Sequence, residues 1–157
     1  MIRPAKDADA RDIRALWNLA IRDTLITFNS VEKSLDEVRG AIHDYDAFVV
    51  AESDGVVLGY AAFGPFRAGA GYAHTKEHSI MLAPDARGRG IGRALMRALE
   101  DEGRAQGVHS LIASVSGSNP DSTAFHVALG FAQVGIVPEA GRKFGRWHDL
   151  ILMQKRL

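Results

Sequence analysis

A short segment dense in glycine and arginine, residues 87–93, stands between an apolar run and an amphipathic stretch. The apolar run has the character of a strand and is stopped by Pro84, which cannot donate to a strand's hydrogen bonds. After the segment, apolar side chains including Ile91, Leu95 and Leu99 recur at helical spacing. The segment therefore predicts a strand–turn–helix unit within a mixed α/β chain.

The helix predicted after this segment carries its charges in an unfavourable order. A helix N-terminus has a partial positive charge, so acidic residues usually gather there, and reversing the order costs about 0.3–1 kcal/mol per charge. The residues concerned are the arginines at the start, Arg87, Arg89, Arg93 and Arg97, and the acids toward the end, Glu100, Asp101 and Glu102. A bound anion would remove the conflict, because glycines let a phosphate approach the backbone N–H groups. The alternative is a solvated basic turn that binds nothing.

Two common phosphate-binding patterns do not fit the segment. The dinucleotide fingerprint needs a third glycine where this chain has Arg93, and the Walker A loop needs a Gly-Lys-Ser/Thr sequence that is absent. The pattern that remains is Arg-x-x-Gly-x-Gly, at Arg87, Gly90 and Gly92.

The rest of the chain alternates between helical and strand-like patterns. One helical stripe runs from Ile13 to Ile21, a second helix is expected from Ser34 to Asp44, and Asn119 is expected to cap a third. Either Asp7 or Asp9 is a candidate cap for the first helix, and Gly103 and Gly107 are expected to end the helix after residue 90. Strands are expected over residues 48–51, 56–63, 78–82, 110–115, 131–136 and 150–153. With one more strand expected before the first helix, the predicted order is strand, two helices, three strands, helix, strand, helix and two strands.

Length and charge exclude several classes of protein. A chain of 157 residues is typical of one domain, expected to span residues 1–157. Its 19 basic and 19 acidic residues cancel, which argues against nucleic-acid binding. The chain has no cysteine, as suits the cytoplasm, no signal-peptide pattern, and no apolar run of the ~20 residues that span a membrane.

The Arg-x-x-Gly-x-Gly pattern between a strand and a long helix resembles the pyrophosphate loop of the GNAT acetyltransferase superfamily, and the predicted element order is similar too. Within that superfamily the chain resembles phosphinothricin and methionine sulfoximine acetyltransferases. The residues that carry this narrower resemblance are 77–79, Asn119 with Ser122, Phe125-His126 and 141–149.

The resemblance implies a fold and a co-substrate. The expected fold is a mixed, mostly antiparallel sheet of about seven strands flanked by helices, splayed between the fourth and fifth strands. The splay would admit the pantetheine arm of acetyl-CoA, with no metal involved. The cofactor residues that the resemblance implies are Ile80, Met81, Leu82, Arg87, Gly88, Arg89, Gly90, Ile91, Gly92, Arg93, Asn119 and Ser122.

The resemblance also implies an acceptor site. Glu77 is the expected base that removes a proton from the amine, directly or through water, and His126 is the expected acid for the leaving thiolate. The acceptor pocket is expected to include Phe28, Arg67, Tyr72, Glu77, His78, Ser79, Lys143, Phe144 and Trp147. At Ala73 such relatives tend to carry arginine, so this pocket is expected to differ in detail.

The activity expected from these residues is acetylation of the amine of an amino acid or amino-acid analogue. Direct transfer in a ternary complex is expected, because no cysteine is available to carry the acetyl group. A homodimer is expected by analogy with relatives. The alternatives are acetylation of a polyamine or protein amine, and a catalytically idle acyl-CoA-binding module. Residues 74–78 also spell H-x-x-E-H, but that zinc signature requires a helix, and a strand is expected here.

Overall fold

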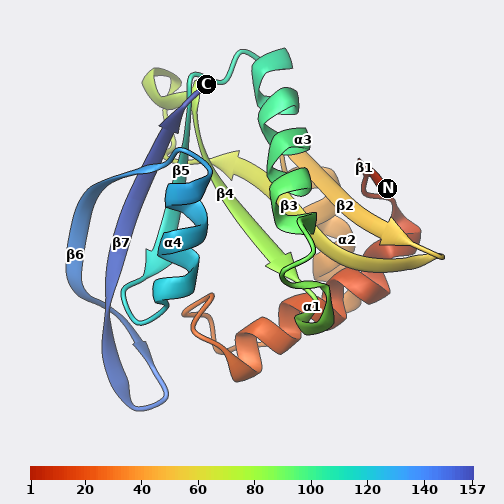
Figure 1. Cartoon of the computed structure of the whole chain (residues 1–157), viewed down its shortest axis with the longest axis horizontal. Coiled ribbons are helices and arrows are strands. Elements are labelled where there is room, and N and C mark those ends of the chain that lie inside the picture. Colours follow the sequence, from red (N-terminus) through yellow and green to blue (C-terminus); the bar gives the residue numbers. More distant parts are fainter.

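The computed structural model of the protein describes residues 1–157 and contains one seven-stranded sheet with helices on both faces (Figure 1). The strand order across the sheet is β1-β2-β3-β4-β5-β7-β6. The elements, in chain order, are β1 (Ile2–Pro4), α1 (Ala10–Asp23), α2 (Leu35–Asp44), β2 (Ala47–Ser53), β3 (Val56–Pro65), β4 (Thr75–Leu82), α3 (Ile91–Ala105), β5 (Ser110–Ser116), α4 (Pro120–Ala128), β6 (Ala132–Lys143) and β7 (Arg146–Arg156). This order confirms the predicted sequence of strands and helices.

The sheet is antiparallel except where β4 meets β5, and that parallel pairing is short. It covers Thr75 to His78 on β4 and ends at the His78–Ala113 pair, although β4 continues to Leu82 and β5 to Ser116. The two strands diverge beyond that pair (Figure 1). The expected splay between the fourth and fifth strands is therefore confirmed, and it leaves backbone groups of both strands without a strand partner.

Alternating side chains of the central strands build two separate cores, one on each face of the sheet. On β3, Ala61 and Phe63 pack with residues of α3, whereas Tyr60 and Ala62 pack with residues of α1 and α2. Each face is thus closed by its own helices, and the helices hold both strands of the splay in place. None of the helices has the length and apolar content of a membrane-spanning segment.

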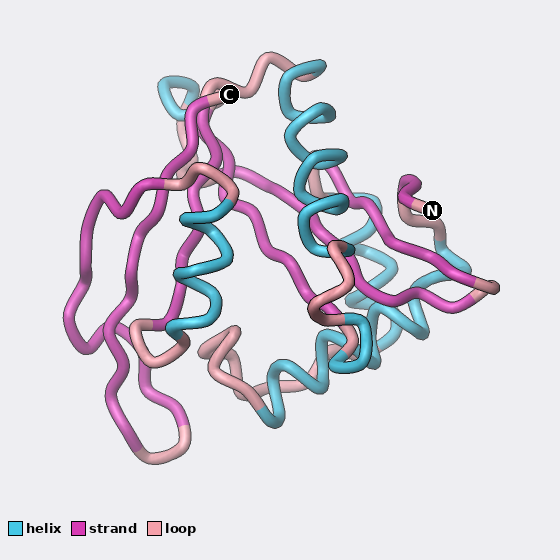
Figure 2. Tube along the Cα trace, viewed as in Figure 1, coloured by secondary structure: helices cyan, strands magenta, loops and turns pink.

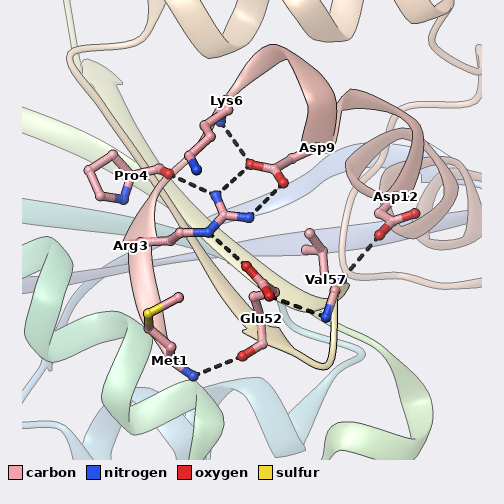
Figure 3. A network of polar contacts seen from close by, with 9 residues as sticks. Met1, Arg3, Pro4, Lys6, Asp9, Asp12, Glu52 and Val57 are labelled. Atoms are coloured by element: carbon pink, nitrogen blue, oxygen red, sulfur yellow. Dashed lines mark hydrogen bonds and ion pairs between the residues drawn. The ribbon is translucent and has the colours of Figure 1, made fainter.

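A polar network ties the N-terminus to the β2–β3 hairpin (Figure 3). Arg3 donates to both carboxylate oxygens of Asp9 at 2.8 Å and to Glu52 at 2.9 Å. The Arg3 guanidinium holds the pKa of Asp9 below its usual range. Asp9 also accepts a hydrogen bond from the backbone N–H of Lys6, so its side chain stabilises this turn. The sequence predicted Asp9 as a candidate cap of α1, but its side chain makes no hydrogen bond to that helix.

Several element boundaries differ from the predicted ones. The strand at 78–82 begins earlier, at Thr75, and the last two strands form a hairpin twice as long as expected, with β6 exposed over most of its length. An exposed edge strand needs no apolar alternation, so the pattern could not reveal it. Gly103 lies inside α3, where Leu157 packs against it, while Gly107, at φ +76°, follows the end of that helix. Asn119 caps α4 as predicted and accepts a hydrogen bond from Ser122.

Candidate active site

Two adjoining cavities open where β4 and β5 diverge. The larger has a volume of about 730 Å³ and the smaller about 310 Å³. The residues that line both are Leu25, Ile26, Ile80, Asn119 and Ser122, so the cavities meet at β4 and the start of α4. A reaction between two bound molecules would take place at this junction.

The larger cavity contains the glycine–arginine segment and the N-terminus of α3. Gly88 and Gly90 have φ of +72° and +78°, a region that favours glycine. Gly90 caps α3 without a side-chain hydrogen bond, and no acid stands in the first turn. Arg87 and Arg93 line the same cavity, whose wall also contains Asp23 and Asp121. The two arginines and the free N–H groups of the helix start make this end of the cavity positive. The anion-binding interpretation therefore has the geometry it requires.

This cavity fits the pyrophosphate and pantetheine portions of acetyl-CoA. The N–H groups of Ile91, Gly92 and Arg93 have no acceptor in the chain, as expected for a first helical turn. A side chain at position 92 would meet the Phe125 ring at 3.0 Å, so glycine keeps this approach open. Beyond His78, the β4 edge that faces β5 has backbone N–H and C=O groups without a strand partner, and this edge leads toward the smaller cavity.

The smaller cavity holds one carboxylate among aromatic walls. Glu77 is partly buried and accepts a hydrogen bond from the Ser114 hydroxyl at 3.0 Å. Trp17, Phe28 and Tyr45 form aromatic parts of the wall, and no lysine or arginine lines the cavity. Burial, together with the nearby charge of Glu77, raises the pKa of Tyr45. The cavity therefore suits a compact molecule that presents a cationic amine to Glu77.

Two buried histidines face each other beside this carboxylate. Nε2 of His78 lies 3.0 Å from Nε2 of His126, and Nδ1 of His126 lies 2.7 Å from the Ser122 carbonyl oxygen. Burial, and then the neighbouring His126, lowers the pKa of His78 to about 3; burial also lowers the pKa of His126. Both rings are therefore neutral at neutral pH.

The neutral state fixes both tautomers of this pair. A carbonyl only accepts, so His126 carries its proton on Nδ1 and accepts at Nε2. His78 must then donate from Nε2, which leaves its Nδ1 as an acceptor, and this buried atom has no partner. His126 is thus occupied at both ring nitrogens.

Strand alternation places the carboxylate and the histidines on opposite faces of β4. Met81, which follows Glu77 and Ser79 on the same face of the strand, packs into the core beneath α1 and α2. Ile80 and Leu82, which follow His78 in register, pack into the core beneath α3. The splay opens a passage between the two faces, so Glu77 and His126 line one cavity from either side.

Most of the predicted cofactor residues lie in the larger cavity. Its walls contain Ile80, Leu82, Arg87, Gly88, Gly90, Gly92, Arg93, Asn119 and Ser122. Met81 lines only the smaller cavity, while Arg89 and Ile91 line neither.

The predicted acceptor residues divide into two groups. Those that line the smaller cavity are Phe28, Glu77, His78 and Ser79, together with the predicted acid His126. Phe144 borders the larger cavity instead, and the exposed side chains of Arg67, Tyr72 and Trp147 line neither. Arg67 lies over the Phe66 ring and Trp147 beneath Arg142.

Lys143, which was predicted to belong to the acceptor pocket, lines neither cavity. The residue is buried, and Nζ donates to the carbonyl oxygens of Thr24 and Thr27 at 2.6 and 2.7 Å. These carbonyls belong to the loop after α1, so the ammonium group is bound to the main chain of that loop.

Sequence reasoning did not assign Trp17 or Tyr45 to the site, and in the loop after α1 it assigned only Phe28. Trp17 belongs to the apolar stripe of the first helix and Tyr45 directly follows the second helix, and their position at a cavity arises only in three dimensions. A local signal did exist in β5, where Ser114 and Ser116 alternate with apolar residues in a buried strand. Serines on one face of such a strand indicate a polar lining.

Comparison with known proteins agrees with this geometry. The acetyltransferase (GNAT) family profile matches residues 13–131. An L-methionine sulfoximine/L-methionine sulfone acetyltransferase of Pseudomonas paraeruginosa is 38% identical over 99% of this chain and 94% of its own length. The structure of a phosphinothricin acetyltransferase from Sinorhizobium meliloti in complex with acetyl-CoA is 36% identical, with TM-score 0.92, and the match covers 100% of this chain and 88% of that one.

A further structure of similar closeness carries a different name. The ribosomal-protein-alanine N-acetyltransferase from Brucella melitensis is 40% identical, with TM-score 0.94, over 100% of this chain and 99% of that one. With a family match over most of the chain and relatives of this identity, the chain belongs to the acetyltransferase (GNAT) family.

Proposed function

We propose that this protein transfers the acetyl group of acetyl-CoA directly to the amine of an amino acid or amino-acid analogue of the methionine sulfoximine or phosphinothricin type. The observation that carries the proposal is the junction of the two cavities, one with a phosphate-binding helix terminus and one with Glu77. The whole chain, residues 1–157, then acts as one acetyltransferase domain with no metal.

The proposed base and the proposed acid of the reaction lie on opposite faces of β4. An amine must lose a proton before it attacks, and Glu77, which lines the smaller cavity, is the proposed base, acting directly or through a water. Acetyl-CoA, when bound, supplies the activated acetyl group as a thioester. The N–H groups of β4 alternate between its two edges, and that of Met81 faces β3. The N–H groups of Ile80 and Leu82, on the unpaired edge, would hold the thioester and stabilise the negative charge on its carbonyl oxygen.

His126 is proposed to serve the leaving thiolate from the other face. Because it is neutral and accepts from His78, it delivers a proton only after the histidine pair has gained one. An ammonium group gives up two protons as it becomes an amide, one before it attacks and one as the tetrahedral intermediate collapses. One proton is needed on the sulfur, and the other is released to solvent.

The choice of acceptor follows from the size and walls of the smaller cavity. About 310 Å³ with three aromatic walls suits a small amino-acid analogue better than an extended polyamine. The Pseudomonas paraeruginosa relative is named for such acceptors. A protein amine is the second candidate, favoured by the name of the Brucella melitensis structure, and an idle acyl-CoA-binding module is the third.

We also propose that the protein acts as a homodimer in the cytoplasm, where acetyl-CoA is available. The β6–β7 hairpin exposes a group of apolar side chains that a second copy would cover: Val134, Ile136, Val137, Phe144 and Trp147.

The pH dependence of a Glu77→Gln variant tests the proposed reaction. At neutral pH an α-amine is largely an ammonium ion, so loss of the base should lower kcat/KM by about 10²–10⁴-fold. The deficit should narrow as pH rises and the free amine becomes abundant. An exposed acid, Glu139→Gln, serves as the control. Equal rates for Glu77→Gln and the unmodified protein at every pH would exclude this role.

A further inference from the structure

The loop after α1 forms a wall that is common to both cavities. The wall segment, residues 24–29, contains no helix or strand (Figure 2). Every residue in it nevertheless lines at least one of the cavities. Leu25 and Ile26 line both. A segment without its own secondary structure keeps a fixed shape only if other parts of the molecule hold it.

Lys143, on β6, holds this wall segment by its main chain. Its side-chain nitrogen donates to the carbonyl oxygens of Thr24 and Thr27 and lies 3.5 Å from that of Ala20. An ammonium group has three N–H donors, and all three have main-chain partners here. Lys143 is 6% exposed, and burial lowers the pKa of its ammonium group. Removal of the ammonium would leave buried carbonyls without their donor.

A second contact holds the same segment from its other end. The Phe28 ring lies where a side chain at position 141 would stand, so only Gly141 admits it. Phe28 also stacks on His148, with ring centroids 5.7 Å apart and planes at 20°. Strands β6 and β7 therefore contact the wall segment at two places: the backbone of Thr24 and Thr27, and the ring of Phe28.

His148 connects these contacts with the wall of the larger cavity. Nε2 of this ring donates to the Lys143 carbonyl oxygen at 3.0 Å, so its Nδ1 accepts from the Ser118 hydroxyl at 2.9 Å. Ser118 lines the larger cavity next to the cap of α4. One connected set of contacts thus fixes walls of both cavities.

We propose that Lys143 is a positioning residue, which acts with Gly141 and His148 as a clasp that fixes the wall segment for both substrates. This inference rests on the proposed function in that it takes the two cavities as the substrate sites. It assigns Lys143 a role different from binding of the acceptor's carboxylate, and the two roles predict different kinetics.

A pair of acceptors separates these roles in a Lys143→Met variant. Methionine sulfone carries a carboxylate, and 3-(methylsulfonyl)propylamine is the same molecule without it. If the clasp is the role of Lys143, KM should rise by a similar factor for both, on the order of tenfold for the loss of a charged hydrogen-bonding group. Affinity for acetyl-CoA should fall as well, while kcat at saturation changes little. Arg142→Met, an exposed neighbour on the same strand, is the matched control.

Two results would overturn the proposal. A rise in KM confined to methionine sulfone would make Lys143 a ligand of the carboxylate. Unchanged KM and acetyl-CoA affinity would show that the wall segment needs no clasp. General destabilisation is distinguishable from both, because it lowers the amount of active enzyme without changing KM.

A second variant tests the clasp without touching Lys143 and without any acceptor. Gly141→Ala should displace the Phe28 ring, increase amide hydrogen exchange in residues 24–29 and weaken acetyl-CoA binding, and Phe28→Leu in the same chain should reverse part of both effects. These readouts remain valid if no amine is acetylated, so failure of the proposed function and failure of the clasp are separate outcomes. Unchanged exchange in Gly141→Ala would refute the clasp.

Discussion

The buried pair of histidines makes a quantitative prediction about acid stability. Burial lowers the pKa of His78 to about 3 in the folded protein, whereas an unfolded histidine titrates near ~6.5. As pH falls below the unfolded pKa, His78 binds a proton in the unfolded chain but stays neutral in the folded chain. Folding stability is therefore lost with falling pH, and for this one group the loss from pH 7 to pH 5 is about 2 kcal/mol.

The variant His78→Gln isolates this contribution. A glutamine amide does not titrate, and its N–H group can replace the donor that His126 accepts from. The free energy of unfolding, measured in urea at pH 7 and pH 5, should fall by about 2 kcal/mol more in the unmodified protein than in the variant. Carboxylates such as Asp9, whose pKa is lowered by Arg3, also weaken the fold in acid, but they do so equally in both proteins and cancel.

Equal losses of stability in the two proteins would refute this reasoning. That result would mean that His78 accepts a proton in the folded state as readily as in water. It would also remove the argument for neutral, fixed tautomers, and His126 would then be free to carry a proton on Nε2.

Two further predictions concern the cofactor cavity and the N-terminal network. Gly92→Ala should lower acetyl-CoA affinity measured by calorimetry, because the added carbon meets Phe125 at the helix terminus, and unchanged affinity would mean that acetyl-CoA does not approach this turn. Arg3→Met should reduce the free energy of unfolding by about 1–3 kcal/mol, because Asp9 loses both of its Arg3 hydrogen bonds in a largely buried site. A loss that persists in Arg3→Met with Asp9→Asn would contradict that cause.

Local patterns in the sequence were enough to predict the backbone shape at the proposed phosphate-binding end of the site. The segment 87–93 determines its own backbone shape through its glycines, and its reversed charges signal an unmet anion regardless of the rest of the fold. The position of Glu77 on β4 was predicted, because the apolar pattern places a strand there; its role as the base stays a prediction. The order of elements followed from periodicity, whereas the splayed, mostly antiparallel sheet was implied by the resemblance to the GNAT superfamily.

The acceptor side depends on contacts between distant segments, and there the sequence was less informative. Lys143 and Thr24 are far apart in the chain, so no local pattern shows that the lysine meets main-chain carbonyls and not a substrate. Trp17 and Tyr45 have the spacing of core residues, and whether such a side chain borders a cavity is decided by the splay of strands elsewhere. His126 was identified, but its partner His78 lies on another element, so the state of its ring nitrogens could not be inferred.

The measurement that tests the central claim most directly is coenzyme A release with acetyl-CoA and a panel of amines, with the acetylated product identified by mass. The panel contains methionine sulfoximine, methionine sulfone, phosphinothricin, common amino acids, spermidine and a peptide with a free N-terminus. The account predicts that kcat/KM is highest for an amino-acid analogue. Turnover of spermidine or the peptide alone would contradict the assignment of the smaller cavity, and acetyl-CoA binding without turnover of any amine would contradict the proposed reaction.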